Sequence, residues 1–253
     1  MMTGTNTEQQ KLLKKISRKA GVTMRDHQMV SSGDHVLLGL SGGKDSMILL
    51  EVMADRKSAM PFDFKLTAAH IRVADIGYQA ELHVMQEHCE KLGIDFIVKD
   101  TAIGESDKKQ KGICFLCSWN RRKALFDLTR ELNCNKLVLG HHRNDALETL
   151  LLNMIYHGSI SSMPYTLKMF DGRVELIRPL LDMNESLLHA YADLRAFNAE
   201  GEKCTHETSN HRDEIRKMMA GIEELHGPGP HNMFRAMDKI FSEYLPQKKA
   251  RTS

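Results

Sequence analysis

The sequence predicts an α/β fold in which helices cover both faces of a parallel β-sheet. Short apolar runs alternate with longer segments of helical spacing between residues 35 and 156. Such runs are typical of parallel strands that are buried on both sides. A glycine pair, Gly42-Gly43, separates the first apolar run from the helical segment after it, which lets the backbone approach a ligand closely. With 253 residues, the chain is long enough to bury a substantial core.

The elements of this core are predicted from the N-terminus onward. Leu12, Leu13 and Ile16 lie at helical spacing, which predicts a helix over Gln9–Ala20 that packs beside the core. Apolar runs then predict strands, and the periodic segments between them predict helices. The strands are His35–Leu40, Phe62–His70, Asp95–Lys99 and Lys136–Gly140, and the helices are Lys44–Ala54, Tyr78–Leu92, Trp119–Leu132 and Asp145–Tyr156.

A hairpin and further helices are predicted after the core. Extended runs on either side of Asp171-Gly172 predict a hairpin over Tyr165–Arg178. Helices are expected over Asn184–Phe197 and Asp213–Leu225, and the segment Gly227–Pro230 breaks the helical pattern. We therefore expect an N-terminal helical extension (1–30), a core domain (31–182) and a C-terminal helical segment (183–253).

Three predicted loops open at the carboxyl ends of the strands, where ligands of parallel sheets bind. They are Ser41–Ser46, His70–Asp75 and Gly140–Asp145. The first places backbone N–H groups at a helix start, which is an anion site. It is not a Walker A loop, because Asp45 follows Lys44, and it lacks a dinucleotide fingerprint. A tight turn in which Asp45 or Ser46 caps the helix is the simpler alternative.

Composition narrows the class of protein. A formal net charge of +2 with 27% charged residues gives no polyelectrolyte character that would demand a nucleic-acid partner. No apolar run reaches the roughly 18 residues of a membrane span, and the N-terminus has no apolar signal core. We therefore expect a cytoplasmic protein without membrane contact. Five cysteines, an odd number, point to thiol or metal chemistry rather than to disulfides.

Cys114 and Cys117 lie three residues apart at a predicted helix start, and Cys204 is the nearest third candidate. A redox dithiol, a structural zinc ion with His206 as fourth ligand, and an iron–sulfur cluster are all compatible with this spacing. The remaining two cysteines, Cys89 and Cys134, are expected to be buried structural thiols, as free cysteines usually are.

Four motifs occur in order along the chain, from about Lys11 to Phe241. They are SGGKDS at Ser41–Ser46, CFLCSWNRRKAL at Cys114–Leu125, GHHRNDALETLLLNMIYHG at Gly140–Gly158 and IRPL at Ile177–Leu180. Together they resemble the PP-loop ATP pyrophosphatase family and, within it, the TtcA-like tRNA 2-thiocytidine synthetases. The resemblance implies a HUP-type sheet, the adenine nucleotide alpha hydrolase-like fold, flanked by helices and carrying helical extensions at both ends.

The resemblance implies adenylation of an RNA base, with cytidine in an anticodon loop as the expected target. A base oxygen attacks the α-phosphate of ATP, pyrophosphate departs with Mg²⁺, and a sulfur nucleophile displaces AMP. Backbone N–H groups and a metal ion suit this chemistry because they neutralise the leaving pyrophosphate. The resemblance implies nucleotide contacts from Ser41, Gly42, Gly43, Lys44, Asp45, Ser46, His70, Gly140 and His141.

Catalytic roles are implied for three residues. Asp45 matches a Mg²⁺ partner, Asp145 matches a metal ligand or proton acceptor, and Arg121 matches a cation that faces the reaction. Asn144 stands where the family has its first acid, so one expected charge is missing. His141 and His142 match the paired histidines of the family and are expected to be walls of the site. The loop HIRVAD, with Arg72 and Asp75, departs from the usual acidic loop.

Cys114, Cys117 and Cys204 match the three cysteines that hold a [4Fe-4S] cluster in this group. In the family the open iron is thought to bind the sulfur that is transferred. We also expect tRNA, a sulfur donor such as a cysteine desulfurase, and a second copy of the chain as partners. Two other functions stay open. One is an amide-forming ligase such as lysidine or NAD synthetase, and the other is an RNA-binding or nucleotide-sensing relative.

Basic residues surround the cysteine motif and end the chain. If they surround the mouth of the site, they would contact phosphates of a folded RNA. The alternative is an ordinary solvated surface. They are Lys108, Lys109, Lys111, Arg121, Arg122, Lys123, Lys248, Lys249 and Arg251.

Overall fold

The computed structural model describes residues 2–76, 80–103, 113–197 and 211–246, which form two compact units. The first unit contains residues 1–143 and 163–209, and the second contains residues 144–162 and 210–253. Among the described residues, no helix is long and apolar enough to cross a membrane. The boundaries near residues 30 and 182 that the sequence suggests stay a prediction.

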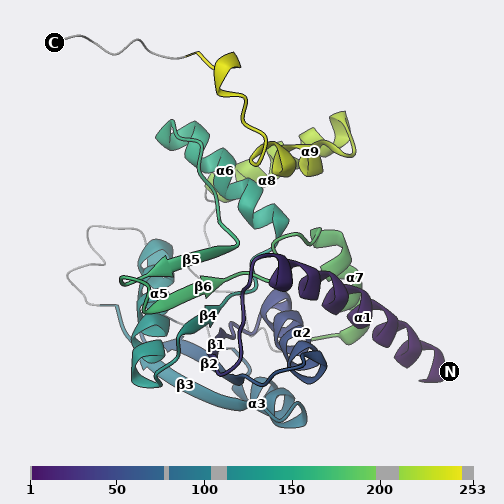
Figure 1. Cartoon of the computed structure of the whole chain (residues 1–253), viewed down its shortest axis with the longest axis vertical. Helices are drawn as coiled ribbons and strands as arrows, with labels where there is room; N and C mark the ends of the chain where they lie inside the picture. Colours follow the sequence, from purple (N-terminus) through teal and green to yellow (C-terminus); the bar gives the residue numbers. More distant parts are fainter. Residues whose placement is uncertain (1, 77–79, 104–112, 198–210, 247–253) are drawn as a thin grey trace. The chain divides into compact units, whose positions relative to one another are not determined.

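The first unit is built on one sheet whose described strands have the order β3-β2-β1-β4-β6-β5 (Figure 1). The strands other than β5 pair in parallel, which confirms the predicted parallel sheet. β5 pairs antiparallel with β6, so the hairpin predicted from Asp171-Gly172 forms one edge of this sheet. The strands are β1 (His35–Gly39), β2 (Lys65–Val73), β3 (Asp95–Thr101), β4 (Lys136–Val138), β5 (Thr166–Met169) and β6 (Val174–Ile177).

Helices cover both faces of the sheet, as predicted. Val36 and Leu38 of β1 belong to the core cluster shared with one group of helices, whereas Leu37 between them packs with Leu128 on the other face. This alternation follows from the two-residue period of a strand. The first face carries α1 (Met2–Asp26), α2 (Lys44–Ala59), α3 (Leu82–Lys91) and α7 (Glu185–Arg195), and the second face carries α5 (Ile113–Glu131).

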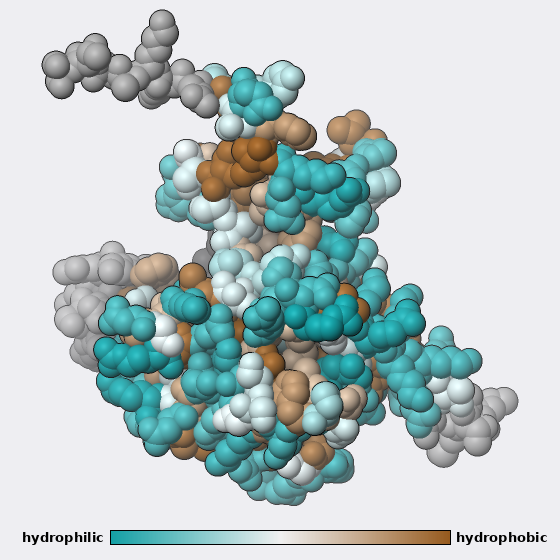
Figure 2. Space-filling view, in the orientation of Figure 1, coloured by the Kyte–Doolittle hydropathy of each residue, from teal (hydrophilic) through white to brown (hydrophobic). Residues whose placement is uncertain are grey.

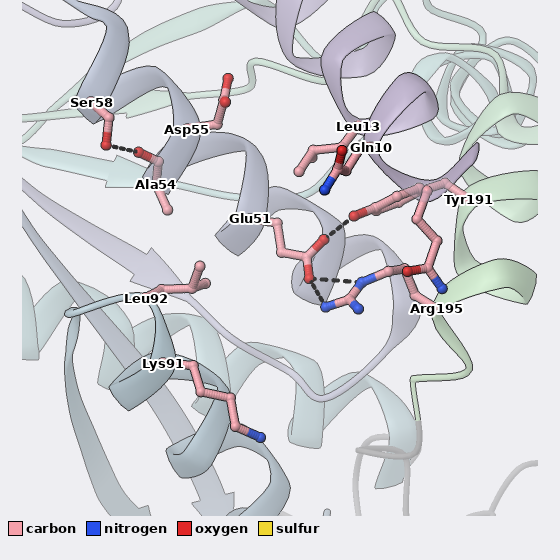
Figure 3. Close-up of a pocket in the computed structure, with 11 residues that line it drawn as sticks. Gln10, Leu13, Glu51, Ala54, Asp55, Ser58, Lys91, Leu92, Tyr191 and Arg195 are labelled. Atoms are coloured by element: carbon pink, nitrogen blue, oxygen red, sulfur yellow. Dashed lines mark hydrogen bonds and ion pairs between the residues drawn. The ribbon is translucent and has the colours of Figure 1, made fainter. Parts of the chain in front are cut away.

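A buried carboxylate joins three helices on the first face. Glu51 of α2 accepts hydrogen bonds from the Tyr191 hydroxyl and the Arg195 guanidinium of α7. His88 of α3 also pairs with it, with 2.9 Å between His88 Nε2 and Glu51 Oε1. Figure 3 shows the Glu51–Tyr191–Arg195 contacts in a cavity of about 500 Å³. Burial alone would raise the pKa of Glu51, but hydrogen bonds from His88, Arg195 and Tyr191 together lower it.

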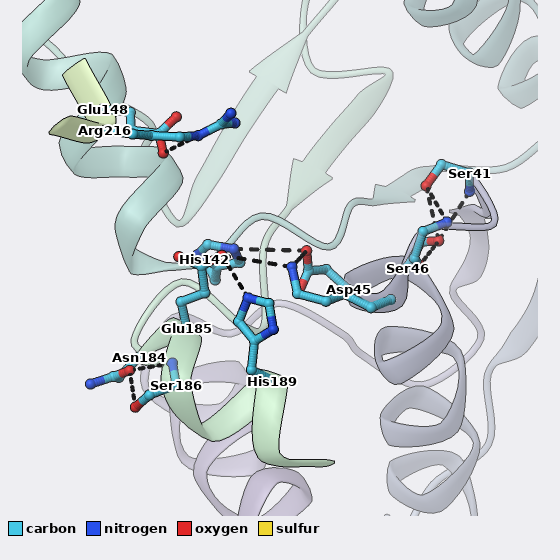
Figure 4. Close-up of polar contacts among 12 residues, drawn as sticks. Ser41, Asp45, Ser46, His142, Glu148, Asn184, Glu185, Ser186, His189 and Arg216 are labelled. Carbon is cyan, nitrogen blue, oxygen red and sulfur yellow. Dashed lines mark hydrogen bonds and ion pairs between the residues drawn. The ribbon is translucent and has the colours of Figure 1, made fainter. Parts of the chain in front are cut away.

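The second unit contains α6, which begins at Arg143 in the first unit and ends at His157. It also contains α8 (His211–Leu225), α9 (Gly229–Ala236) and a short 3₁₀ helix. Glu148 of α6 is buried and pairs with Arg216 of α8, with 3.1 Å between Nε and Oε1 (Figure 4). Figure 2 shows brown, apolar residues gathered on this unit. The large apolar and aromatic side chains of this unit that lie exposed are Met154, Ile155, Tyr156, Ile160, Met218, Leu225, Ile240, Phe241, Tyr244 and Leu245.

Several element boundaries differ from those expected. α1 extends past the predicted Gln9–Ala20 at both ends, α2 ends at Ala59 and not at Ala54, and α3 begins four residues later than predicted. α5 begins at Ile113, six residues before Trp119, so both cysteines of the motif lie in its first turns. α9 (Gly229–Ala236) begins inside the segment interpreted as a helix breaker. Pro230 is tolerated there because the first turn of a helix needs no N–H from it. α8 (His211–Leu225) and the short 3₁₀ helix Ser242–Tyr244 complete the described elements.

Candidate functional site

The glycine-rich loop between β1 and α2 is held by its own serine hydroxyls (Figure 4). Ser46 Oγ accepts a hydrogen bond from the backbone N–H of Ser41 (3.1 Å) and donates to the carbonyl of Gly43 (2.8 Å). Ser41 Oγ donates to Ser46 Oγ (3.0 Å) and accepts from the N–H of Gly43 (3.2 Å). Gly42 has a φ of +91°, which glycine adopts without steric cost. The loop is therefore preformed.

The helix start that follows this loop has no side-chain cap. Gly43 occupies the N-cap position, and no side chain accepts a capping hydrogen bond there. The alternative in which Asp45 or Ser46 caps α2 is therefore wrong, and Asp45 lies in the first turn instead. A helix start without a side-chain cap, at the positive end of the helix dipole, is a site for a phosphate group.

Gly140 brings the loop after β4 against this helix start. A Cβ atom at Gly140 would lie 2.9 Å from the carbonyl oxygen of Asp45 and 3.3 Å from the backbone nitrogen of Ser46. Both atoms belong to backbone, so no side-chain rotation could make room. The absence of a side chain at Gly140 therefore allows two of the three predicted loops to meet.

Charged side chains surround Asp45 (Figure 4). Asp45 Oδ2 lies 3.1 Å from Lys44 Nζ and 3.8 Å from His142 Nε2. Lys44 Nζ also lies 3.7 Å from Glu185 Oε1 at the start of α7, and His189 Nε2 lies 3.2 Å from the same oxygen. Burial would raise the pKa of Glu185, but the positive charges of His142 and Lys44 and the contact with His189 together lower it.

Sequence reasoning did not identify Glu185. Its side chain reaches the loop because α7 packs against α2, a contact between segments far apart in the sequence. A local signal was present, since Asn184 caps α7 by accepting a hydrogen bond from the Ser186 N–H (2.6 Å). That signal predicts the helix start but not the residue that faces it.

A small pocket of about 110 Å³ opens beside the loop, at the carboxyl ends of β1 and β2. Ser41, His70, Arg121 and Leu139 are among the residues that line it. His70 is buried, and its Nδ1 lies 2.8 Å from the carbonyl oxygen of Leu40. Burial lowers the pKa of His70, and the charges of Arg121 and Arg72 lower it further. A neutral imidazole that donates through Nδ1 leaves Nε2 as an acceptor in this pocket.

The two adjacent histidines after β4 have different surroundings. His141 Nδ1 lies 3.3 Å from Nε of Arg178, which is buried and also donates to the carbonyl of Pro164 (2.6 Å). Burial lowers the pKa of Arg178 to about 10, and the charge of Arg122 contributes to this. His142 is buried beside Asp45. Their role as walls of a nucleotide site stays a prediction.

The cysteine pair lies at the start of α5. Cys114 is exposed and Cys117 is half-buried, and Leu116 between them packs against Val73, Ile76 and Ile103. Cys204 and His206 lie outside the described residues. Within the described ranges no group of three or more metal-binding side chains is present, so the choice among dithiol, zinc site and cluster rests on other observations.

Cys89 and Cys134 are buried, as expected for structural thiols. Burial raises the pKa of Cys89 to about 12 and that of Cys134 to about 11. Both thiols therefore stay protonated near neutral pH, which makes them poor nucleophiles and poor metal ligands.

The predicted loop His70–Asp75 is partly wrong, because β2 extends to Val73 and Arg72 lies on it. Arg72 and Asp75 make structural contacts. Arg72 donates two hydrogen bonds to Asp100 on β3, at 2.6 and 2.8 Å. Asp75 accepts from the backbone N–H of Ile103 at 3.0 Å. Asp145 lies in the first turn of α6, in the second unit, and its role as a metal ligand or proton acceptor stays a prediction. Of the basic residues near the cysteines and at the C-terminus, only those from Arg121 to Lys123 lie in the described part.

Comparison with known proteins adds four findings. A model of the PP-loop domain family matches residues 6–221. The tRNA-cytidine(32) 2-sulfurtransferase of Aeromonas salmonicida is 36% identical over 244 residues, which cover 94% of this chain and 80% of that protein. The enzyme of the same name from Pseudomonas putida is 32% identical over 248 residues, covering 96% of this chain and 90% of that protein. The structure of the U34-tRNA thiolase NcsA from Methanococcus maripaludis with its [4Fe-4S] cluster matches with a TM-score of 0.75 and 21% identity, covering 96% of this chain and 82% of that one. This structural match shows that the two chains share a fold.

Proposed function

Because the chain belongs to the PP-loop domain family, we propose that it is an ATP-dependent tRNA sulfurtransferase that thiolates a cytidine. The observation that carries this conclusion is the likeness to tRNA-cytidine(32) 2-sulfurtransferases over 94% of the chain at 36% identity. The preformed loop with its uncapped helix start supports ATP as the co-substrate, because it offers a phosphate site beside a pocket.

In the proposed first step, the O2 atom of the cytidine attacks the α-phosphorus of ATP. The bond from that phosphorus to the bridging oxygen breaks, so pyrophosphate leaves and AMP is joined to the base. In the second step a sulfur nucleophile adds at C2, and the C–O bond to AMP breaks. Ser41, Ser46 and the first turn of α2 support the phosphates, and Arg121 in the pocket wall supports developing negative charge.

Asp45 fits the proposed Mg²⁺ site. Its Oδ1 atom is buried and has no hydrogen-bond partner among the described residues, although a buried carboxylate oxygen normally has one. Mg²⁺ commonly binds one or two carboxylates together with substrate phosphates. A carboxylate oxygen beside the phosphate loop is suited to that arrangement.

The two described thiols of the cysteine motif fit an iron–sulfur site. Cys114 and Cys117 are accessible at the start of a helix, where anionic thiolates are favoured, and Cys204 is the proposed third ligand. A [4Fe-4S] cluster bound there would supply an iron atom that presents the sulfur to be transferred. Cys89 and Cys134 are buried in the two core clusters of the sheet, so they are not proposed as ligands.

Other partners belong to the same proposal. A sulfur donor such as a cysteine desulfurase would renew the transferred sulfur, and the cytoplasm, where tRNA is modified, is the proposed location. The exposed apolar side chains of the second unit, Ile240, Phe241 and Tyr244 among them, support a homodimer. Apolar surface of this extent commonly marks a protein–protein contact.

The test of the function is nucleoside mass spectrometry of tRNA from cells that lack the gene. We expect 2-thiocytidine to disappear and to return when the gene is restored on a plasmid. If every thiolated nucleoside, 2-thiocytidine included, stays at its normal level, the tRNA-thiolation proposal is wrong. An anaerobic absorption spectrum separates the proposal from the ligase alternative, since lysidine and NAD synthetases need no cysteine triad and should show no thiolate-to-iron band.

A further inference from the structure

One face of α5 carries exposed aromatic and basic side chains. Phe115 and Trp119 have 58% and 50% of their surface exposed, and Lys123 follows at the same four-residue interval. Residues four apart lie on one face of a helix. The opposite side of α5 is the one that packs, because Leu116, Ala124 and Leu128 are buried. Large aromatic side chains on the outer face therefore do not contribute to the core.

This aromatic–basic face, defined as Phe115, Trp119, Arg122 and Lys123, adjoins the proposed reaction site. Arg121 lines the pocket beside the phosphate loop, whereas Arg122, the next residue, is exposed. Cys114 directly precedes Phe115. At a rise of about 1.5 Å per residue, Trp119 lies about 7.5 Å along the helix from Cys114.

The charges on this face identify the chemistry of a partner. Lys123 Nζ lies 5.6 Å from the centre of the Trp119 ring, so a positive charge stands beside an aromatic surface. Arg122 adds a second charge, which is close enough to the buried Arg178 to help lower its pKa. A single-stranded nucleic acid satisfies both features, because its bases stack on rings and its phosphates pair with lysine and arginine.

We propose that Trp119, together with Phe115, is the platform on which a base neighbouring the target cytidine stacks, while Arg122 and Lys123 hold the adjacent phosphates. The proposal rests on the function proposed above and specifies how the RNA loop is held. A target base must leave its stack to reach the pocket, which costs a few kcal/mol. A ring that receives the neighbouring base offsets part of that cost and fixes the position of the loop.

Trp119 is itself the reporter for the first test, because it is the single tryptophan of the sequence. The full chain is titrated with an unmodified tRNA transcript and, separately, with blunt double-stranded RNA of equal length, whose bases stay paired. We expect the tRNA to quench Trp119 fluorescence and the duplex to leave it unchanged. Labelled tRNA is followed by anisotropy in the same titration. Bound tRNA without a change in Trp119 fluorescence would overturn the proposal.

Variants give the second test. Trp119→Ala should weaken tRNA binding about 5- to 150-fold, the range that corresponds to loss of one stacked base, and Trp119→Phe should restore most of it. Lys123→Ala should reduce the slope of log affinity against log salt by about one. Arg130→Ala is the matched control, because Arg130 is a basic residue at the far end of the same helix with 79% of its side chain exposed. It should bind tRNA as the unaltered chain does.

The outcomes separate this proposal from the function on which it rests. If 2-thiocytidine is lost from tRNA of cells without the gene but Trp119→Ala binds tRNA with unaltered affinity, the platform is wrong and the function stands. If 2-thiocytidine persists in those cells and the chain binds no tRNA, both are wrong. Circular dichroism of each variant confirms that a loss of binding is not a loss of folding.

Discussion

Gly140→Ala tests whether the close approach of the two loops controls the ATP site. The added Cβ would lie 2.9 Å from the oxygen and 3.1 Å from the carbon of the Asp45 carbonyl, and 3.3 Å from the Ser46 nitrogen. Since all three are backbone atoms, either the loop after β4 or the first turn of α2 must move by a few tenths of an ångström. Asp45 and Ser46 would move with that turn.

Overpacking of this kind costs about 1–3 kcal/mol of the free energy of unfolding. If the first turn of α2 moves, the uncapped N–H groups no longer face the phosphates as they do in the structure. A loss of about 1.4 kcal/mol in binding is a tenfold loss in affinity. We therefore expect a lower urea midpoint together with ATP affinity reduced about tenfold, measured by urea unfolding and by calorimetric titration with ATP.

Gly221→Ala is the matched control. Gly221 lies inside α8, and a Cβ there would meet no atom within 4 Å. Alanine in place of glycine stabilises a helix interior by about 0.5–1 kcal/mol, so this variant should be at least as stable and bind ATP equally well. The reasoning is refuted if Gly140→Ala matches Gly221→Ala in both unfolding midpoint and ATP affinity.

Three further predictions concern other parts of the chain. Cys114→Ala and Cys117→Ala should lose most of the iron measured in anaerobically purified protein, whereas Cys89→Ala should keep its iron. Full iron content in the first two variants would remove those cysteines from the ligand set. Asp45→Asn should release less pyrophosphate with tRNA and ATP while its free energy of unfolding stays within about 1 kcal/mol of that of the unaltered chain, and unchanged release would make Asp45 structural. Glu51→Gln should cost about 3 kcal/mol near neutral pH, because it removes the charge from a buried pair. Because the pKa of Glu51 is lowered, its contribution to the free energy of unfolding is complete above the ordinary pKa of 4.5 and is lost as pH falls through the lowered pKa. Equal stability of the two proteins at pH 7, or a difference that grows in acid, would contradict a stabilising role of the Glu51 charge.

The parallel core and the edge that carries the site could be predicted from the sequence because both depend on local signals. Apolar runs mark buried strands wherever they occur, and the glycine pair marks the turn after β1. Long-range contacts have no such local signal. The pairing of β6 with β4 and the approach of Glu185 to Lys44 both depend on segments that return after a long interval. The sequence does not predict helix α9 for another reason: the segment Gly227–Pro230 indicates a breaker, although proline also suits the first turn of a helix.

The charges at the phosphate loop explain why ATP would need a cation to bind there. Lys44 lies between two carboxylates, Asp45 and Glu185, so its single positive charge is already matched by two negative ones. The start of α2 contributes the equivalent of only about half a positive charge. Lys44 therefore brings no surplus of positive charge to a triphosphate, and the proposed Mg²⁺, carried in with ATP and met by Asp45, would supply it.

On α5, by contrast, Arg122 and Lys123 are exposed and have no carboxylate paired with them among the described contacts. The two anionic substrates would then be recognised by different means, ATP through backbone N–H groups and a metal ion, and RNA through basic side chains beside an aromatic ring.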